Sequence, residues 1–254
     1  MLNFNTIIWQ LKKIPRKTYN KDAFTKTAGL RNPYRYYLFE ELKNNFHENY
    51  FSNKRILEIG PKDGEDSLRL ASLNPSELIL IDLPENKDPN HHNNKFHEEY
   101  FLPNYKKIDL NTKIIYENFN YIKKEKLNSL GKFDLIWCTG VLYHTQEQLR
   151  LLRKIFNLLN FKGVLVLETA TTRNNNLKKY RVIEVSETGE YHFPSRNAVI
   201  TMLEMIGFKN LIISNCFDKE NYNKKSIRFA LLAQKKEQVT QKLYREKYLY
   251  GDAT

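Results

Sequence analysis

Two acids and two glycines are spaced in this sequence as a nucleoside-binding site requires. Glu58 ends a short apolar run and is followed by Gly60 and Gly64, and Asp82 closes a second apolar run about 20 residues later. Glycines in a turn between a strand and a helix allow the backbone to approach a ligand. An acid at the end of the next strand can accept hydrogen bonds from both ribose hydroxyls. The pattern predicts that these four residues contact a nucleoside.

The spacing of the glycines distinguishes between classes of nucleoside. It reads E-x-G-x-x-x-G, whereas dinucleotide enzymes carry G-x-G-x-x-G, so a nicotinamide dehydrogenase is disfavoured. The carboxylate of Glu58 would repel a pyrophosphate and would suit a cationic ligand. S-adenosylmethionine, a sulfonium nucleoside, meets this requirement. An ordinary strand-to-helix turn is the alternative for the glycine pair taken alone.

Apolar runs alternating with helical patterns supply the elements that would position these residues. Residues 55–59, 77–82 and 113–116 read as parallel strands buried on both faces, because their apolar character is nearly continuous. Glu117 and Asn118 follow the third of these strands, and Asn118 or Glu117 is predicted to accept a hydrogen bond from the adenine amino group. Phe119 is predicted to stack on the adenine.

A second group of reactive side chains follows a predicted strand at residues 133–139. Thr139 ends this strand and is predicted to bind the cofactor. Tyr143 and His144 follow in a loop at the edge where open α/β sheets bind ligands. His144 is the candidate general base because an unperturbed imidazole titrates near neutrality, with local packing as its alternative role. Tyr143 is predicted to form a wall of the pocket in which the reaction takes place, and a T-x-x-Q capping box directly after His144 predicts the next helix.

The residues that bind the acceptor substrate are predicted from the basic and aromatic side chains of a long loop at residues 171–193. Loops at this edge of the sheet usually carry substrate specificity. Arg173, Arg181 and Tyr191 are therefore predicted to contact the acceptor. A helix capped by Ser195 and two final antiparallel strands follow, an ending that is not typical of dehydrogenases.

Length and composition fit one α/β domain with additions. The 254 residues divide into a helical cap at 1–49, a domain at 50–235 and a charged tail at 236–254. Within the cap, the residues around Ile7 are expected to form a short helix, and residues 34–47 a longer one. No apolar run approaches the roughly 18 residues that a membrane helix needs, so no membrane contact is predicted.

The cysteine content and the net charge indicate in which compartment the protein occurs and which partners it could bind. Cys138 and Cys216 lack the spacing of a disulfide framework or a metal site, which predicts a cytoplasmic protein. The histidines and acids of residues 84–112 lack an HExxH pattern, so a solvated insertion without a metal is predicted there. The formal net charge of +12 would attract a polyanion, but the lysines are scattered, which favours an ordinary solvated surface.

Four motifs together resemble those of the class I S-adenosylmethionine-dependent methyltransferases: ILEIGPKDG, LILIDL, FDLIWCTGVLYH and GVLVLETA. The resemblance covers about residues 50 to 235. It implies a Rossmann-like α/β fold with a seven-stranded, mostly parallel sheet whose last strand is antiparallel. It also implies a transferase that moves a methyl group from S-adenosylmethionine to an oxygen or nitrogen of a small-molecule or glycan acceptor. One departure is Lys62, where the family usually carries a glycine.

Four shorter segments, GVLYH, LVLET, FPS and IRFALLA, are similar to the tRNA wobble-uridine carboxymethyltransferases, which use carboxy-S-adenosylmethionine. This resemblance implies that Tyr143 and Arg228 help to hold the extra carboxylate, a task suited to the planar fork of an arginine. A tRNA acceptor with the carboxylated cofactor is therefore the alternative function. A cofactor-binding subunit without catalysis, suggested by Lys62, is the third. The sequence does not indicate the oligomeric state.

Overall fold

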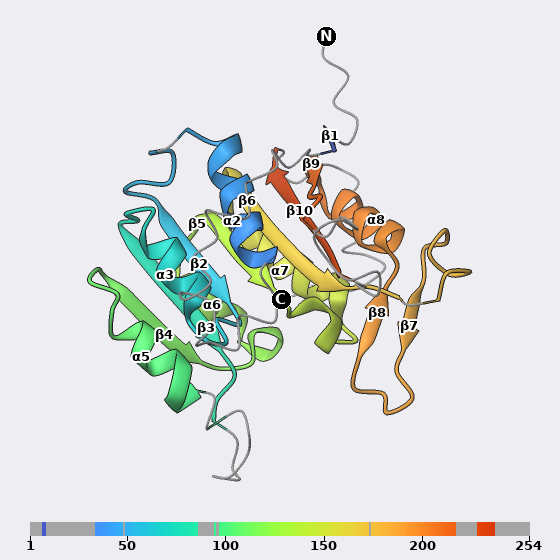
Figure 1. Ribbon diagram of the computed structural model, residues 1–254, viewed down its shortest axis with the longest axis horizontal. Helices are drawn as coiled ribbons and strands as arrows, with labels where there is room; N and C mark the ends of the chain where they lie inside the picture. Colours follow the sequence, from blue (N-terminus) through green and yellow to red (C-terminus); the bar gives the residue numbers. More distant parts are fainter. Residues whose placement is uncertain are drawn as a thin grey trace, which may run out of the picture.

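The computed structural model describes residues 7–8, 34–47, 49–85, 94, 97–172, 174–216 and 228–236. These residues form a central sheet with helices on both faces and a separate hairpin at one end (Figure 1). The sheet strands are β1 Ile7–Ile8, β2 Arg55–Ile59, β3 Glu77–Asp82, β4 Thr112–Tyr116, β5 Phe133–Thr139, β6 Leu159–Ala170, β9 Phe208–Ile213 and β10 Arg228–Lys235. The helices are α2 Tyr34–Asn45, α3 Glu65–Ala71, η3 His97–Phe101, α5 Leu102–Tyr105, η4 Phe119–Tyr121, α6 Lys124–Ser129, η5 Leu142–His144, α7 Gln148–Leu158 and α8 Arg196–Ile206.

Seven of the sheet strands confirm the predicted topology. Their order is β4-β3-β2-β5-β6-β10-β9, and β10 runs antiparallel to both of its neighbours while β2 to β6 are parallel. After β2 the chain adds β3 and β4 on one side of β2, and then crosses over to place β5 on the other side of β2. The sheet therefore has a topological switch point between β2 and β5, the place where open α/β sheets form a ligand crevice.

The core lies on both faces of the sheet, which explains the nearly continuous apolar strands. Along β2, Ile56 packs in one hydrophobic cluster, whereas Leu57 and Ile59 pack in the other. Helix α7 buries its apolar side in the second cluster, and α2 buries Leu38 and Leu42 in the first. Burying an aliphatic side chain stabilises the fold by about 1.5–3 kcal/mol. The core therefore holds the carboxyl ends of β2 and β5 in a fixed relation.

The described part of the N-terminal region departs in one respect from the prediction. Helix α2 confirms the helix expected at residues 34–47. The short helix expected around Ile7 is wrong at Ile7 and Ile8, because these two residues pair in parallel with Ile212 and Ile213 at the edge of the sheet. A β-branched pair suits this extended pairing better than a helix. The other residues of 1–33, and nearly all of the predicted tail, lie outside the described residues.

Two further local predictions are wrong. The described part of the predicted solvated insertion packs against the body of the protein, and Phe101 and Asn104 are buried there. The predicted capping box does not form, because α7 begins only at Gln148. Thr145 Oγ1 accepts a hydrogen bond from the backbone N–H of Glu147 at 3.0 Å, while Gln148 Nε2 donates to the carbonyl of His192 at 2.6 Å. None of the helices described here is long and apolar enough to cross a bilayer.

Candidate functional site

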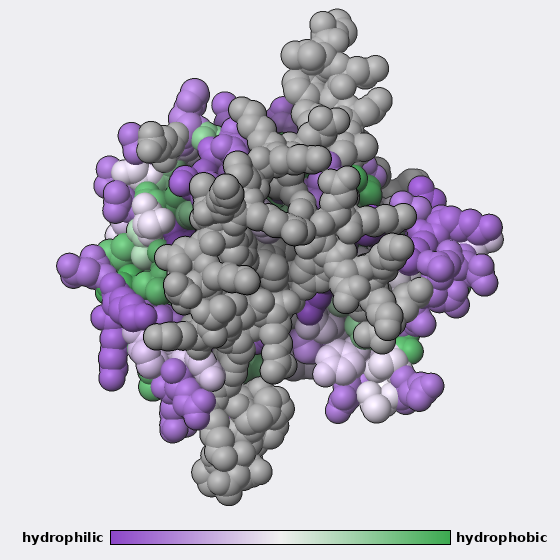
Figure 2. All heavy atoms as spheres, viewed as in Figure 1, coloured by the Kyte–Doolittle hydropathy of each residue, from purple (hydrophilic) through white to green (hydrophobic). Residues whose placement is uncertain are grey.

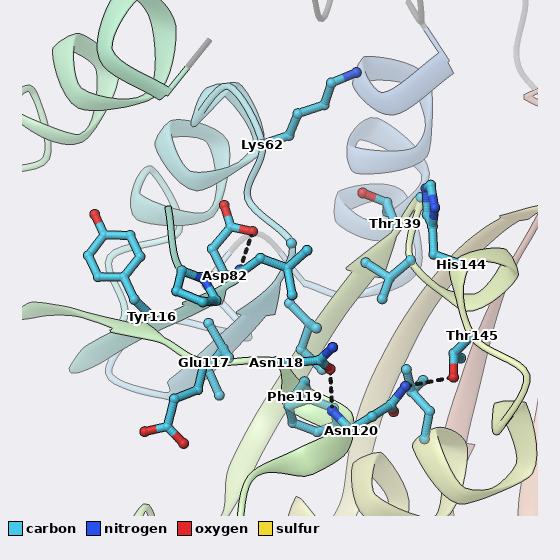
Figure 3. A pocket seen from close by; sticks show the side chains of 18 of the residues that line it. Lys62, Asp82, Tyr116, Glu117, Asn118, Phe119, Asn120, Thr139, His144 and Thr145 are labelled. Atoms are coloured by element: carbon cyan, nitrogen blue, oxygen red, sulfur yellow. Dashed lines mark hydrogen bonds between the residues drawn. The ribbon is translucent and has the colours of Figure 1, made fainter. Parts of the chain in front are cut away.

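A cavity of about 670 Å³ opens at the carboxyl edge of the sheet, among the loops that follow β2, β3, β4 and β5 (Figure 3). This volume lies in the range of small-molecule sites. Asp82 and His144 lie on opposite sides of the cavity. The structure brings together five of the predicted site residues in its lining: Gly60, Asp82, Asn118, Thr139 and His144.

The glycine turn adopts a conformation that suits glycine. Gly60 has φ +74°, and a Cβ there would lie 2.7 Å from Val141 Cγ2 in the loop after β5. Gly64 has φ +75° at the start of α3, and its Cβ would lie 3.1 Å from Asn104 Cβ. Side chains are disfavoured at both positions by the backbone and by the space. Gly60 lines the cavity, whereas Gly64 shapes the turn from behind the lining.

Asp82 ends β3 at the side of the cavity next to Leu83. Burial raises the pKa of this carboxyl to about 6, although the backbone N–H of Leu83, which donates to Oδ1 at 2.8 Å, acts in the opposite direction. When ionised, a carboxylate at the end of this strand can accept two hydrogen bonds from a ribose diol. The position fits the predicted role of Asp82.

The loop after β4 forms the neighbouring wall. Asn118 Oδ1 accepts a hydrogen bond from the backbone N–H of Asn120 at 3.0 Å, so the predicted bond from adenine to Asn118 would use its second lone pair. The ring of Phe119 is buried beside it. Lys154 fixes this loop from α7, because its Nζ donates to the carbonyls of Phe119 (3.3 Å), Asn120 (2.5 Å) and Ile122 (3.0 Å).

Lys154 was missed in the sequence, although a signal for it exists. Its neighbours Leu151, Leu152 and Ile155 belong to the buried side of α7, and Lys154 itself is 3% exposed. A lysine among the buried positions of an amphipathic helix needs polar partners, since an unpaired buried charge is very costly. The helical pattern therefore indicates a buried ammonium group, but it does not identify the three carbonyls.

Glu58 lies behind the cavity rather than in its lining. The side chain is 1% exposed, and Ser67 Oγ donates to Glu58 Oε2 at 2.5 Å. Burial, followed by the negative charge of Asp66, raises the pKa of Glu58 well above its ordinary value. Asp66 in turn forms an ion pair with Arg35 at 3.3 Å. The predicted contact between Glu58 and the amino acid end of the ligand stays a prediction.

Arg35, at the start of the helix expected at residues 34–47, lines the cavity from α2. A Cβ on Gly140 would lie 3.2 Å from Arg35 Nη2. Thr139 adjoins the same cluster, because its Oγ1 donates to Asp66 Oδ2 at 3.4 Å. Helix α2 thus brings a buried cation to the switch point from a segment that precedes β2.

His144 is held in η5 at the opposite side of the cavity from Asp82. Burial, followed by the positive charges of Arg228 and Lys62, lowers the pKa of His144 below its ordinary value. The imidazole is therefore mainly neutral at pH 7 and keeps a lone pair that can take a proton. Lys62 lines the cavity with φ +55°, in the left-handed conformation that glycine usually takes in this loop.

Tyr143 and Arg228 lie together next to His144. The guanidinium carbon of Arg228 is 5.0 Å from the centroid of the Tyr143 ring. Arg228 Nη1 also pairs with Glu168 Oε1 at 3.1 Å, and Glu168 is fully buried. Neither Tyr143 nor Arg228 belongs to the cavity lining itself. The pair is placed to act on a group that extends beyond the cavity.

Tyr191, Arg181 and Arg173, the other residues predicted to contact the acceptor, differ in their position relative to the cavity. The ring centroid of Tyr191 is 5.2 Å from that of His144, so Tyr191 adjoins the site. Arg181 is exposed and its Nε donates to Thr201 Oγ1 at 2.8 Å on α8, outside the cavity lining. Its predicted contact with the acceptor stays a prediction. Arg173 lies outside the described residues.

Comparisons with known proteins indicate the family of the chain and its fold. A family model described as "Methyltransferase domain" matches residues 32–212. The chain is 28% identical over 220 residues to the tRNA U34 carboxymethyltransferase of Helicobacter pylori (strain HPAG1), an alignment that covers 82% of this chain and 64% of the relative. It is 29% identical over 189 residues to that of Campylobacter jejuni (strain RM1221), covering 70% and 57%. The chain thus spans less than two thirds of the length of these relatives.

Solved structures share the fold. The 1,6-didemethyltoxoflavin-N1-methyltransferase of Burkholderia thailandensis is similar with a TM-score of 0.55 and 14% identity, over 87% of this chain and 84% of that one. A putative S-adenosylmethionine-dependent methyltransferase of Listeria monocytogenes is similar with a TM-score of 0.56 and 14% identity, over 80% and 98%. These similarities confirm the predicted Rossmann-like fold.

Proposed function

Because the chain belongs to the methyltransferase-domain family, we propose that it transfers a methyl group from S-adenosylmethionine to an oxygen or nitrogen of a small-molecule or glycan acceptor. One observation carries the proposal. Asp82, whose carboxylate can accept hydrogen bonds from a ribose, and His144, a neutral base, lie on opposite sides of one cavity. Gly60 also lines this cavity. This arrangement suits a nucleoside at one end and a proton transfer at the other.

The residues of the chain would mainly hold two reactants in line. Bound S-adenosylmethionine supplies an activated methyl group on a sulfonium ion. Asp82 accepts hydrogen bonds from the ribose, and the loop held by Lys154 walls the adenine. His144 accepts the proton of the acceptor hydroxyl at a ring nitrogen, while the loop geometry keeps the attacking atom close. The positive charges of Arg228 and Lys62 favour loss of that proton to solvent afterwards.

The charge of the hairpin beside His144 supports a small or glycan acceptor. This hairpin consists of β7 Ile183–Val185 and β8 His192–Pro194. It carries three glutamates and no lysine or arginine from residue 183 to 194. In Figure 2, drawn in the orientation of Figure 1, hydrophilic residues cover the right edge, where the loop that leads into β7 lies, and the hairpin below that loop shows pale and hydrophobic residues among hydrophilic ones. A concentration of carboxylates next to the site disfavours a phosphate backbone there.

The second candidate is carboxymethyl transfer to a tRNA uridine with carboxy-S-adenosylmethionine. The position of Arg228 against Tyr143, next to His144, favours it, because a guanidinium there is suited to bind a carboxylate. The names of the Helicobacter and Campylobacter relatives agree with this candidate. The two candidates differ in both cofactor and acceptor.

Native mass spectrometry of the purified protein, followed by calorimetry with S-adenosylmethionine and with carboxy-S-adenosylmethionine, tests the proposal. We expect binding of S-adenosylmethionine with a micromolar dissociation constant and no strong preference for the carboxylated form. A preference of tenfold or more for the carboxylated form, together with a salt-sensitive shift of bulk tRNA on a gel, would support the second candidate instead. Absence of binding to both ligands at high micromolar concentration would refute both.

A further inference from the structure

Three aromatic side chains gather beside His144, outside the cavity lining. They are Tyr143 from η5, Tyr191 from the hairpin turn and Phe193 from β8. We propose that these rings form an aromatic wall on which the acceptor packs, and that the acceptor is a sugar ring. This inference rests on the proposed methyl transfer and specifies the acceptor class within it.

Each of the three rings is offset from the other two, and they do not form a single column. The centroid separations are 6.0 Å for Tyr143 and Tyr191, 6.1 Å for Tyr143 and Phe193, and 5.9 Å for Tyr191 and Phe193, with interplanar angles of 30°, 14° and 21°. In a three-ring stack the outer centroids would be about twice as far apart as neighbouring ones. Three equal separations with nearly parallel planes describe a stepped surface.

The same distances exclude a slot for a planar ring among these three residues. Two rings that sandwich a third planar ring need centroids roughly 7–8 Å apart, since each contact between carbon atoms takes about 3.5–4.0 Å. The observed separations of 5.9–6.1 Å are smaller. The wall therefore offers contact on one side only. A pyranose fits such a surface, because its C–H groups form an apolar face and its hydroxyls point outward from the ring edge.

The wall adjoins the reactive end of the cavity. The ring centroid of His144 is 4.1 Å from that of Tyr143 and 5.2 Å from that of Tyr191. His144 itself lines the cavity. A sugar that packs on Tyr191 and Phe193 would thus present its edge hydroxyls toward the imidazole. This is the geometry that removal of a hydroxyl proton requires.

Hydrogen bonds fix the wall in the folded protein. The backbone N–H of Ser186 donates to the carbonyl of Tyr191 at 2.8 Å, and the N–H of Tyr191 donates to Ser186 Oγ at 3.0 Å. Gln148 Nε2 donates to the carbonyl of His192, which ties β8 to the start of α7. A preorganised wall binds a ligand without the cost of ordering it first.

Polar groups on the same hairpin suit hydroxyl groups. Glu187 and Glu190 are exposed near the turn, and Thr188 Oγ1 donates to Glu190 Oε2 at 3.3 Å. Carboxylates and hydroxyls accept and donate the hydrogen bonds that sugar hydroxyls need. A nucleotide would bring phosphates to these carboxylates, which is unfavourable. The carboxylates and the ring geometry therefore favour a neutral sugar, because the Arg228 guanidinium, 5.0 Å from the centroid of the Tyr143 ring, would repel an ammonium group.

Saturation-transfer NMR on the protein loaded with S-adenosylhomocysteine tests the wall. The probes are a panel of methyl hexopyranosides, with uridine monophosphate for comparison. We expect saturation to reach the ring C–H protons of at least one glycoside. Tyr191→Ala and Phe193→Leu should weaken this binding at least fivefold; the leucine keeps apolar volume and removes the ring. Phe161→Ala is the matched control, because Phe161 is 58% exposed near the start of β6, away from the carboxyl edge.

Two outcomes would overturn the inference. In the first, the protein binds S-adenosylhomocysteine normally, but no NMR saturation passes from the protein to any of the glycosides. The other is binding of uridine monophosphate that Phe193→Leu weakens while no glycoside binds, which would assign the wall to a nucleobase. Calorimetry with S-adenosylhomocysteine is measured separately on each variant. If the wild-type protein does not bind S-adenosylhomocysteine, the proposed function is refuted. If it binds S-adenosylhomocysteine but no glycoside, only the proposal of a sugar on the aromatic wall is refuted.

Discussion

Asn120 donates its side-chain amide to Thr145 Oγ1 at 2.8 Å, which joins the loop after β4 to the loop after β5 (Figure 3). Thr145 directly follows His144, and Asn120 is held by Lys154 through its carbonyl. The wall next to the expected adenine and the residue next to the expected proton transfer therefore share one hydrogen bond. Removal of this hydrogen bond should therefore affect both cofactor binding at the adenine end of the cavity and proton transfer at the His144 end.

Thr145→Val should alter both ends of the site. Valine keeps the shape of threonine but removes the acceptor, so the side-chain amide of Asn120 and the backbone N–H of Glu147 each lose a hydrogen bond, at a cost of about 1–3 kcal/mol for a buried group. We expect the KM for the cofactor to rise and kcat to fall, each by about fivefold to tenfold, in steady-state assays. Ser129→Ala, which removes a surface bond to the carbonyl of Lys126, is the control. A change in stability with unaltered kcat and KM would show that the bond has only a structural role.

Asp82→Asn should change stability and cofactor affinity in opposite directions. The pKa of Asp82 in the fold, about 6, exceeds its ordinary value, so the fold favours the protonated form and this stabilisation is lost as pH rises through about 6. Asparagine avoids that loss, and thermal unfolding at pH 7.5 should show a gain of about 1–2 kcal/mol after allowance for solvent screening. Calorimetry should show cofactor affinity about 10-fold to 100-fold weaker, since hydrogen bonds to a charged acceptor are lost.

The affinity of the wild-type protein should also depend on pH through Asp82. Below about pH 6 the carboxyl becomes protonated and loses acceptor capacity, so the cofactor should bind more weakly as pH falls from 7.5 to 5. Asp82→Asn should flatten this dependence. An unchanged pH dependence in the variant would mean that another group controls binding.

His144→Asn should lower kcat by about 10²–10⁴-fold if the acceptor is a hydroxyl, because a general base contributes on this scale. The KM for the cofactor should change little, since the ring lies across the cavity from Asp82. In the wild-type protein, kcat should fall on the acid side, below the ordinary pKa of histidine, because burial and neighbouring cations lower the pKa of His144. A less than tenfold effect with an unaltered pH profile would assign His144 a packing role.

Arg228→Met distinguishes the two candidate cofactors. Removal of the guanidinium should weaken binding of carboxy-S-adenosylmethionine at least tenfold and binding of S-adenosylmethionine less than twofold. The variant should also be less stable, because the ion pair between Arg228 and the buried Glu168 is lost. Arg196→Met is the matched control, since Arg196 also lies over an aromatic ring, that of Phe229, at 5.6 Å. Equal losses for both cofactors would argue against a specific carboxylate contact.

The sequence predicted the sheet because burial on both faces leaves a strong apolar pattern in strands such as β3 and β5. The shortest strands could not be predicted from the sequence. Strand β1 has two residues and each strand of the β7–β8 hairpin has three, which is too few for an alternating pattern of apolar and polar residues to be recognised. The positions of Asp82 and His144 could be predicted because both follow directly from strand ends. The polar surroundings of Glu58 could not, since Ser67 and Asp66 reach it from across the turn.

The close approach of Gly60 to Val141 has a consequence for engineering this protein. The first glycine turn and the start of the loop that carries His144 meet at a distance where one added methyl group would collide with Val141 Cγ2. Evolution or design that enlarges either position must remodel the other. Changes of acceptor preference should therefore accumulate in the hairpin at Tyr191 and Phe193, which can diversify without disturbing the nucleoside pocket.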